Sequence, residues 1–404
     1  MFDVESFISQ YVTGRSGSLF QTDVESNHDL IAERVSGKSL CVIGGAGSIG
    51  SQFIKAILPF HPSKLVVVDL NENGLAELSR DLRSTDGLFI PKDYRTYTID
   101  FAGRIFENIF RKENGFDIVA NFSAHKHVRS EKDKYSVEAL IENNLLKAKR
   151  LMDLLSTCPP ERFFCVSTDK AANPINVMGA SKRVLEDLIM SYGDRFTVTT
   201  ARFANVAFSN GSLLDGFLNR LSKKQPLAAP NDVKRYFVSP QESGQICLMA
   251  CVLGNSGEVF FPKLGQESMM SFSDICDRFL EANGLDKIEF DSDDDARKYA
   301  AEILPSGESG GYPVVYSRSD TTGEKPYEEF YTDGEEIEMD RYASLGVITG
   351  SDRKSKEEVG ALMDGLSELF ADDSFTKQDV VGCLERYLPS FTHEEKGLNL
   401  DQKM

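Results

Sequence analysis

Short apolar runs alternate with helical periodicity over roughly the first half of the chain. Each run has four to seven residues and ends at glycine, proline or polar turn residues, which is typical of buried strands. The predicted strands cover residues 38–43, 64–68, 96–99, 116–122, 163–166 and 196–202. The amphipathic segments between them are predicted helices. Alternating strands and helices predict an α/β protein with a Rossmann-type doubly wound parallel sheet.

A glycine-rich turn follows the first predicted strand and opens a predicted helix over residues 51–58. At such a turn the backbone must bend tightly and approach a pyrophosphate at a helix N-terminus. The residues predicted to do so are Gly44, Gly47, Ser48, Ile49 and Gly50. The flanking strand and helix make this pattern more specific than glycines alone. A dinucleotide site is therefore predicted here.

Asp69 ends the second predicted strand, about 20 residues beyond the glycines, as expected for a dinucleotide fold. A carboxylate there accepts hydrogen bonds from the adenosine ribose and repels a 2′-phosphate. The sequence therefore predicts NAD rather than NADP as the cofactor. The alternative is that Asp69 is a solvated residue at the start of the turn over residues 71–74.

The composition of the chain limits the partners and the cellular compartment that we expect for the protein. The formal net charge of −18 disfavours nucleic acid and anionic membranes as general partners. Seven scattered cysteines suit a reducing compartment, and no apolar run approaches the roughly 20 residues that span a bilayer. The start of the sequence lacks a signal-peptide pattern, and the histidines lack the spacing of a metal site. We expect a cytoplasmic protein without a bound metal.

Residues 163–183 contain the largest group of candidate catalytic side chains. Thr168, Asp169 and Lys170 follow the end of the fifth predicted strand, and a predicted helix begins near Met178. Met178 and Lys182 are four residues apart and share one helix face. By itself this stretch also fits an ordinary strand-loop-helix with surface charges.

The motifs at residues 167–171 (STDKA) and 176–183 (NVMGASKR) resemble extended short-chain dehydrogenase/reductases. They are most similar to the nucleotide-sugar 4,6-dehydratases of bacterial polysaccharide synthesis, in which a YxxxK pair follows a Ser/Thr-rich turn. Here methionine takes the tyrosine position, as in some members of that branch. The resemblance extends over roughly residues 38–345.

The resemblance implies a UDP-N-acetylglucosamine 4,6-dehydratase that uses NAD. It assigns Lys170 to the C5 proton, Asp169 to the C6 oxygen and Lys182 to the nicotinamide ribose. Because a thioether has no proton to give, Met178 cannot serve the C4 hydroxyl. Thr168, a water molecule or Asp169 must do so.

The resemblance also implies further contacts. The expected cofactor contacts are Asp100, Phe101 and Ser123, with the first two at the adenine. The expected substrate contacts are Lys126, His127, Asn205, Ser212 and Arg235. Asn143 stands where relatives keep an asparagine. Residues 319–330 resemble the family's GEK-x-x-EE element, but Thr321 and Thr322 replace its usual Arg-Pro pair.

The predicted organisation has four parts. Residues 1–37 form an N-terminal arm, 38–212 the NAD-binding domain, 213–350 mainly a smaller mixed α/β substrate-binding lobe, and 351–404 a helical extension. We expect a homo-oligomer. Two other functions remain open: an epimerase of the same superfamily, and a non-catalytic dinucleotide sensor, against which the Asp169-Lys170 pair argues.

Overall fold

A nine-stranded sheet forms the centre of the computed structural model, which describes residues 2–127, 131–305, 310–319, 325 and 327–393. Seven neighbouring strands are parallel, in the order β3 (Asp93–Thr98), β2 (Lys64–Asp69), β1 (Ser39–Ile43), β4 (Ile118–Asn121), β5 (Arg162–Val166), β6 (Thr197–Ala201) and β11 (Val259–Pro262). The chain winds outward from β1 in both directions, which confirms the predicted doubly wound sheet. Two antiparallel strands, β16 (Leu345–Gly350) and β15 (Glu336–Glu338), complete it.

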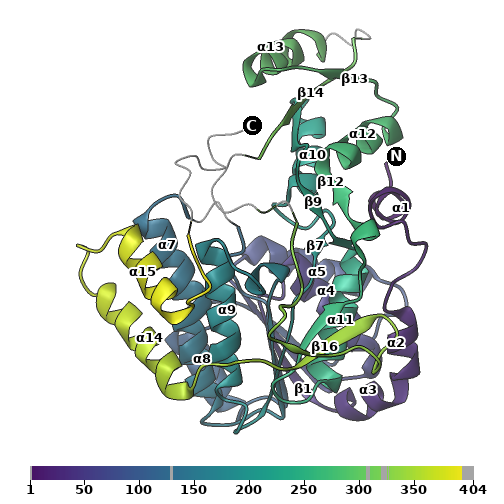
Figure 1. Cartoon of the computed structure of the whole chain (residues 1–404). Helices are drawn as coiled ribbons and strands as arrows, with labels where there is room; N and C mark the ends of the chain where they lie inside the picture. Colours follow the sequence, from purple (N-terminus) through teal and green to yellow (C-terminus); the bar gives the residue numbers. More distant parts are fainter. Residues whose placement is uncertain (1, 128–130, 306–309, 320–324, 326, 394–404) are drawn as a thin grey trace.

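Helices cover both faces of this sheet (Figure 1). On one side α4 (Ser48–Ile57) packs against α11 (Pro240–Leu253), which also contacts α3 (His28–Val35). On the other side α7 (Lys134–Ile141), the π-helical turn η4 (Glu142–Leu146) and α8 (Lys147–Leu155) follow one another and pack on α9 (Val177–Met190). Further helices connect the strands: α5 (Glu72–Ser84) and α6 (Arg104–Lys112).

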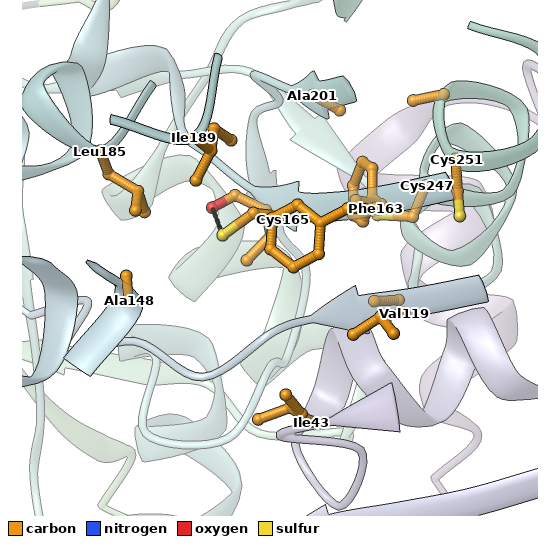
Figure 2. Packing of buried hydrophobic residues seen from close by; sticks show 14 of the residues in the cluster. Ile43, Val119, Ala148, Phe163, Cys165, Leu185, Ile189, Ala201, Cys247 and Cys251 are labelled. Carbon is orange, nitrogen blue, oxygen red and sulfur yellow. Dashed lines mark hydrogen bonds between the residues drawn. The ribbon is translucent and has the colours of Figure 1, made fainter. Parts of the chain in front are cut away.

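The core is continuous from the sheet into α11 (Figure 2). Phe163 and Cys165 of β5 are almost completely buried, and so are Cys247 and Cys251 of α11. The two α11 cysteines are one helical turn apart and belong to the apolar core. Each fully buried large apolar side chain contributes about 1.5–3 kcal/mol to folding. All seven cysteines are free thiols.

The N-terminal arm is folded onto the rest of the chain. It contains α1 (Val4–Phe7), η1 (Ile8–Thr13), α2 (Gln21–Ser26) and α3. Asp23 of α2 is buried, and its two oxygens accept hydrogen bonds from the backbone N–H groups of Ala343 (2.6 Å) and Ser344 (2.8 Å). A buried carboxylate thus ties the arm to the segment that enters β16.

A second, smaller unit surrounds a three-stranded parallel sheet. Its strands are β13 (Lys287–Glu289), β14 (Tyr312–Ser317) and β8 (Leu227–Pro230), and its helices are α10 (Leu213–Ser222), α12 (Phe272–Ala282) and α13 (Asp293–Ile303). Its core contains Phe217 and Phe279, against which Phe7 of the arm packs. The sequence from 213 to 350 divides between this unit and the large sheet, since β11, β15 and β16 return to the latter.

The two outer strands of the large sheet differ from its apolar interior. Every residue of β3 is at least partly exposed, and Arg95 pairs with Asp93 (2.7 Å) and Glu113 (2.9 Å). Lys64 of β2 also reaches Glu113, at 2.6 Å. The opposite outer strand, β15, has only three residues and an irregular register against β16.

The C-terminal extension contains two helices. They are α14 (Lys356–Leu369) and α15 (Lys377–Tyr387), and they pack on η4, α7 and α9 (Figure 1). The polar tail over residues 394–404 lies outside the described residues. Among the helices that the structure describes, none is long and apolar enough to cross a membrane.

Candidate active site

A cavity of about 750 Å³ lies between the carboxyl ends of the parallel strands and the smaller unit. Ligands of doubly wound proteins bind at this end of the sheet. Ten of the predicted site residues line it: Ile49, Lys126, His127, Thr168, Lys170, Met178, Lys182, Asn205, Ser212 and Arg235. The structure therefore brings residues from well-separated parts of the sequence to one site.

The glycine-rich turn is shaped by close backbone contacts. Gly44 has a φ of +73°, and a Cβ there would lie 2.6 Å from the backbone nitrogen of Ser123. A Cβ on Gly50 would lie 2.4 Å from the carbonyl oxygen of Gly44. Contacts this short exclude a larger side chain unless the backbone shifts. The turn after β1 and the chain after β4 thus meet at Ser123, one of the predicted cofactor contacts.

The N-terminus of α4 is arranged to receive an anion. Its N-cap, Gly47, makes no side-chain capping hydrogen bond, and the first N–H groups of any helix lack intrahelical acceptors. Ser48 accepts a hydrogen bond on its hydroxyl from the backbone of Asn210 (2.8 Å), while the neighbouring Ile49 lines the cavity. Open N–H groups and the positive end of the helix dipole fit a pyrophosphate here.

Asp69 lies beside this turn, at the end of β2. Its carboxylate accepts hydrogen bonds from the backbone N–H groups of Ala46 (3.0 Å) and Asn71 (2.9 Å). These two contacts fix its orientation, and each oxygen keeps a further lone pair for a ribose hydroxyl.

Asp100 and Phe101 follow β3 and lie further from the cavity. Asp100 pairs with Lys147 and accepts a hydrogen bond from the backbone of Ala102 (2.9 Å). The side chain of Phe101 is buried in the core. The contact of this pair with adenine stays a prediction.

The stretch after β5 forms a tight pair of opposite charges. Thr168 caps the short turn η5 (Asp169–Ala171), and its hydroxyl donates to Oδ1 of Asp169 at 2.8 Å. Nζ of Lys170 lies 3.1 Å from the same oxygen. Asp169 is buried, whereas Thr168 and Lys170 line the cavity. Lys170 therefore faces the cavity, with Asp169 behind it.

Met178 and Lys182 lie on the cavity face of α9, as predicted from their spacing. Nζ of Lys182 donates to the carbonyl oxygen of Val166 (3.1 Å), at the end of β5. Burial lowers the pKa of Lys182. The first turn of α9 is closed by two side chains: Asn176 accepts from Gly179 N–H (2.7 Å), and Glu131 accepts from Met178 N–H (2.9 Å).

Glu328 is a cavity residue to which sequence reasoning gave no role. Its Oε1 lies 3.8 Å from Nζ of Lys170 and 3.8 Å from Nη2 of Arg235. Burial raises the pKa of Glu328, and the neighbouring Lys170 charge opposes that rise. The GEK-x-x-EE-like element contains Glu328, so the signal was present, although residues 320–324 and 326 lie outside the described part.

Three of the predicted substrate contacts come from separate segments around the cavity. Nζ of Lys126 donates to the carbonyl oxygen of Asn210 (3.2 Å), and burial lowers the pKa of Lys126. Ser212 is the N-cap of α10. Arg235 is buried, and its guanidinium donates to the carbonyl oxygen of Lys325 (2.9 Å).

Asn144 is the buried residue of the pair Asn143 and Asn144 in the long helical segment. Its side chain accepts from His125 N–H (2.9 Å) and donates to the His125 carbonyl (3.0 Å) and to the Ser181 hydroxyl (3.1 Å). These bonds join the loop after β4 to α9. Asn143 is only partly buried and donates to Oδ1 of Asn144 at 3.3 Å.

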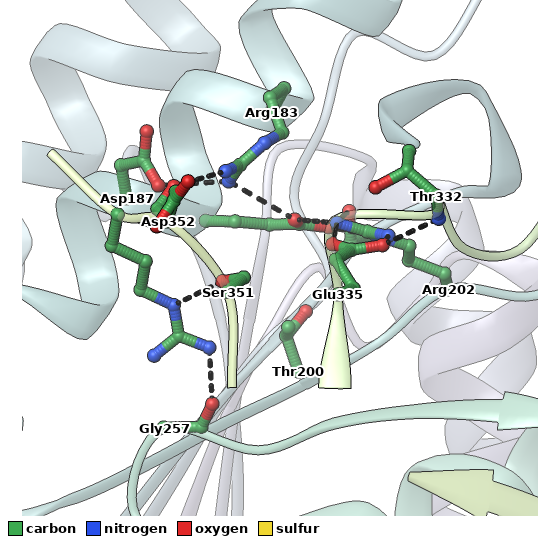
Figure 3. Close-up of polar contacts among 12 residues, drawn as sticks. Arg183, Asp187, Thr200, Arg202, Gly257, Thr332, Glu335, Ser351 and Asp352 are labelled. Atoms are coloured by element: carbon green, nitrogen blue, oxygen red, sulfur yellow. Dashed lines mark hydrogen bonds and ion pairs between the residues drawn. The ribbon is translucent and has the colours of Figure 1, made fainter. Parts of the chain in front are cut away.

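A buried network of ion pairs connects α9 to neighbouring strands and loops (Figure 3). Arg202 donates to Glu186 of α9 (2.7 Å) and to Glu335 (2.8 Å), and Ser167 donates to Glu186 at 2.6 Å. Burial favours a raised pKa for Glu186, but the positive charge of Arg202 outweighs it and lowers the pKa. The ends of β5 and β6 are thereby fixed to the helix that carries Met178 and Lys182.

No cluster of three or more potential metal ligands occurs within the part of the chain that the structure describes.

Residues 40–349 match the family described as polysaccharide biosynthesis protein. The chain belongs to this family. Its similarity to the capsular polysaccharide biosynthesis protein CapD of Staphylococcus aureus is 30% identity over 70% of this chain and 48% of the relative. The chain thus spans about half the length of CapD.

A relative named UDP-N-acetylglucosamine 4,6-dehydratase (inverting), from Campylobacter jejuni, is 26% identical over 57% of this chain and 68% of its own length. The structure of UDP-glucose 4-epimerase from Thermus thermophilus in complex with NAD matches with a TM-score of 0.54 and 17% identity, covering 72% of this chain and 90% of that chain. Such low identity supports the fold alone. Together these matches confirm the predicted superfamily and fold, while the methionine-for-tyrosine subtype stays a prediction.

Proposed function

We propose that this chain is a UDP-N-acetylglucosamine 4,6-dehydratase that makes a UDP-4-keto-6-deoxy-N-acetylhexosamine for bacterial polysaccharide or glycan synthesis. The observation that carries the proposal is the 3.1 Å contact between Asp169 and Lys170, because Lys170 lines a cavity that Lys182 also lines. Dehydration needs an acid and a base next to a dinucleotide, and this pair supplies both.

The cofactor of the proposed reaction is NAD, which would accept the hydride from C4 and return it at C6. The open N-terminus of α4 would hold its pyrophosphate, and Asp69 its adenosine ribose. Lys182 would hold the nicotinamide ribose, since its ammonium group is fixed at the end of β5 by Val166.

Lys170 would act as the base at C5, whose proton becomes acidic once C4 is a ketone. Asp169 would give a proton to the departing C6 oxygen, so that water is lost across C5 and C6. When the hydride returns to C6, Lys170 would give its proton back to C5, so the proton that leaves with the C6 oxygen is the one that Asp169 receives from the C4 hydroxyl. Arg235 would pair with the diphosphate, because a guanidinium matches phosphate oxygens in a bidentate manner.

The C4 hydroxyl needs a proton acceptor other than Met178. Thr168 lines the cavity and donates to Asp169 at 2.8 Å, so its hydroxyl can pass the C4 proton to that carboxylate. This relay uses one carboxylate for two proton transfers at different steps. A water molecule in place of Thr168 is the alternative relay.

An epimerase reaction is the second candidate, since it uses the same NAD site and the same hydride removal at C4. The Asp169-Lys170 pair favours dehydration, because epimerisation at C4 requires no base at C5. A non-catalytic dinucleotide sensor requires neither group.

The test is incubation of the purified protein with UDP-N-acetylglucosamine, followed by NMR of the products. A 4-keto-6-deoxy sugar is the expected product. UDP-N-acetylgalactosamine instead would identify an epimerase, and unchanged substrate in a protein that binds NAD would support the sensor.

A further inference from the structure

The C-terminal extension reaches the candidate active site through one buried contact. After α15 the chain continues through Leu388 and Phe391, both buried, to His393. Nε2 of His393 lies 3.4 Å from Oε2 of Glu131, and each side chain is only 3% exposed. The family match ends at residue 349, so His393 belongs to a part of this chain beyond the matched region.

Glu131 connects this contact to the helix of the site. Its other oxygen, Oε1, accepts the hydrogen bond from the backbone N–H of Met178, the second residue of α9. That N–H group has no acceptor within the helix, and a carboxylate there also interacts favourably with the helix dipole. One side chain thus contacts the C-terminal segment with one oxygen and the first turn of α9 with the other.

The same segment is attached to the extension a second time. Lys134, at the start of α7, pairs with Asp373 at 2.9 Å, in the connection between α14 and α15. Tyr387 of α15 donates to Asp187 near the end of α9 (3.2 Å). The extension therefore connects to α9 both near the site, through Glu131, and far from it, through Tyr387.

We propose that His393 is a positioning residue, which holds Glu131 against the first turn of α9 and thereby fixes Met178 and Lys182 at the cavity. His393 does not line the cavity among the described residues, so it acts through Glu131 rather than on a ligand. The link from His393 to the helix stands on geometry alone. Its effect on catalysis rests on the proposed function.

The test compares four variants of the full-length chain. His393→Ala removes the contact, His393→Gln keeps a side-chain N–H donor, and Glu131→Gln keeps an acceptor for Met178 N–H without the charge. Tyr387→Phe is the matched control, because it removes a hydrogen bond between the same extension and the same helix, distant from the cavity. Hydrogen exchange of residues 177–182, NADH titration, kcat, KM and thermal melting are measured for each.

His393→Ala is expected to speed exchange of the Met178 amide and to weaken NADH binding about tenfold, equivalent to roughly 1.4 kcal/mol. His393→Gln should restore most of both, and Glu131→Gln should fall between them. Tyr387→Phe should lower the melting temperature but leave exchange in the first turn and NADH affinity unchanged.

Wild-type exchange and NADH affinity in a folded His393→Ala protein would overturn the proposal. Equal losses in Tyr387→Phe would also overturn it, since the effect would then be one of general stability. The exchange comparison needs no sugar substrate. Absence of dehydratase activity in the wild type would therefore contradict the proposed function, whereas the exchange and NADH measurements would still test the role of His393.

Discussion

The junction of β1 with α4 and the junction of β5 with α9 have the same topology and opposite chemistry. Each is a parallel strand, a turn at the carboxyl edge of the sheet, and a helix that begins beside the cavity. The first turn of α4 has no capping side chain. In contrast, the first turn of α9 is closed by Asn176 and Glu131.

This difference separates two uses of a helix N-terminus. At α4 the open N–H groups and the small glycines leave room for an anion to serve as the cap. At α9 the protein satisfies these N–H groups itself, and the helix instead presents the side chains of Met178 and Lys182. Binding through the backbone at one junction and through side chains at the other predicts that substitutions will have different effects at the two.

The largest effect is expected at the β5–α9 junction from Lys170→Ala. Loss of the proposed C5 base should lower turnover at least a thousandfold, which is about 4 kcal/mol of barrier. NADH affinity should remain within about threefold, because α4 is untouched. Steady-state kinetics and NADH titration check this, with Lys182→Ala as the counterpart that should weaken NADH binding. Near-normal turnover by Lys170→Ala would remove Lys170 as the base.

A somewhat smaller effect is expected at the β1–α4 junction from Gly50→Ala. The new Cβ would lie 2.4 Å from the carbonyl oxygen of Gly44, so the turn must open. NADH affinity should fall about a hundredfold, or roughly 2.7 kcal/mol. Gly365→Ala in α14 is the control, since a Cβ there meets nothing within 4 Å. Unchanged NADH affinity in Gly50→Ala would show that α4 does not bind the pyrophosphate.

Asp69→Ala should change cofactor preference rather than abolish binding. Without the carboxylate the repulsion of a 2′-phosphate disappears, so the ratio of NADPH to NADH affinity should rise about tenfold, near 1.4 kcal/mol. Titration of the parent and the variant with both cofactors measures this ratio. Equal affinity of the parent for both would contradict the assignment of Asp69.

The smallest effect is expected from Met178→Leu. The thioether contributes only packing, so a leucine of similar volume should cost about 1.5 kcal/mol of stability or less. Turnover should stay within roughly tenfold, whereas Thr168→Val should reduce it more. Thermal melts and steady-state kinetics are compared for the two variants. A thousandfold loss in a folded Met178→Leu protein would show that the role of this position is different.

Most of the parallel sheet could be predicted because its strands are apolar runs with clear ends. The prediction for β5 began at Phe163 and the structure begins it at Arg162. The third strand was placed at Thr96, but β3 begins at Asp93. Asp93 and Arg95 are charged and half-buried at the outer edge of the sheet, with only Tyr94 between them, so no apolar run marks this start.

The site was predictable where its residues are local and not where they meet across long stretches of sequence. Lys170 and Lys182 follow one strand and could be placed at the cavity. Glu328 lies in an element that resembles a family motif, but its contacts with Lys170 and Arg235 form between distant segments, which no spacing reveals. The contact of Glu131 with His393 forms in the same way. The inward position of Asn144 could not be predicted, because the π-helical turn at Glu142–Leu146 has an extra residue per turn that alters which side chain faces inward.

The two outer strands of the large sheet also bear on how the protein behaves at high concentration. An unpaired strand edge can recruit a strand from another molecule, and charged side chains or short length prevent such pairing. At β3, the ion pairs of Arg95 with Asp93 and Glu113 surround the edge with charge, while β15 is too short and irregular to serve as a template. Aggregation by strand addition is therefore disfavoured at both edges of the sheet, and the residues responsible lie outside the candidate active site.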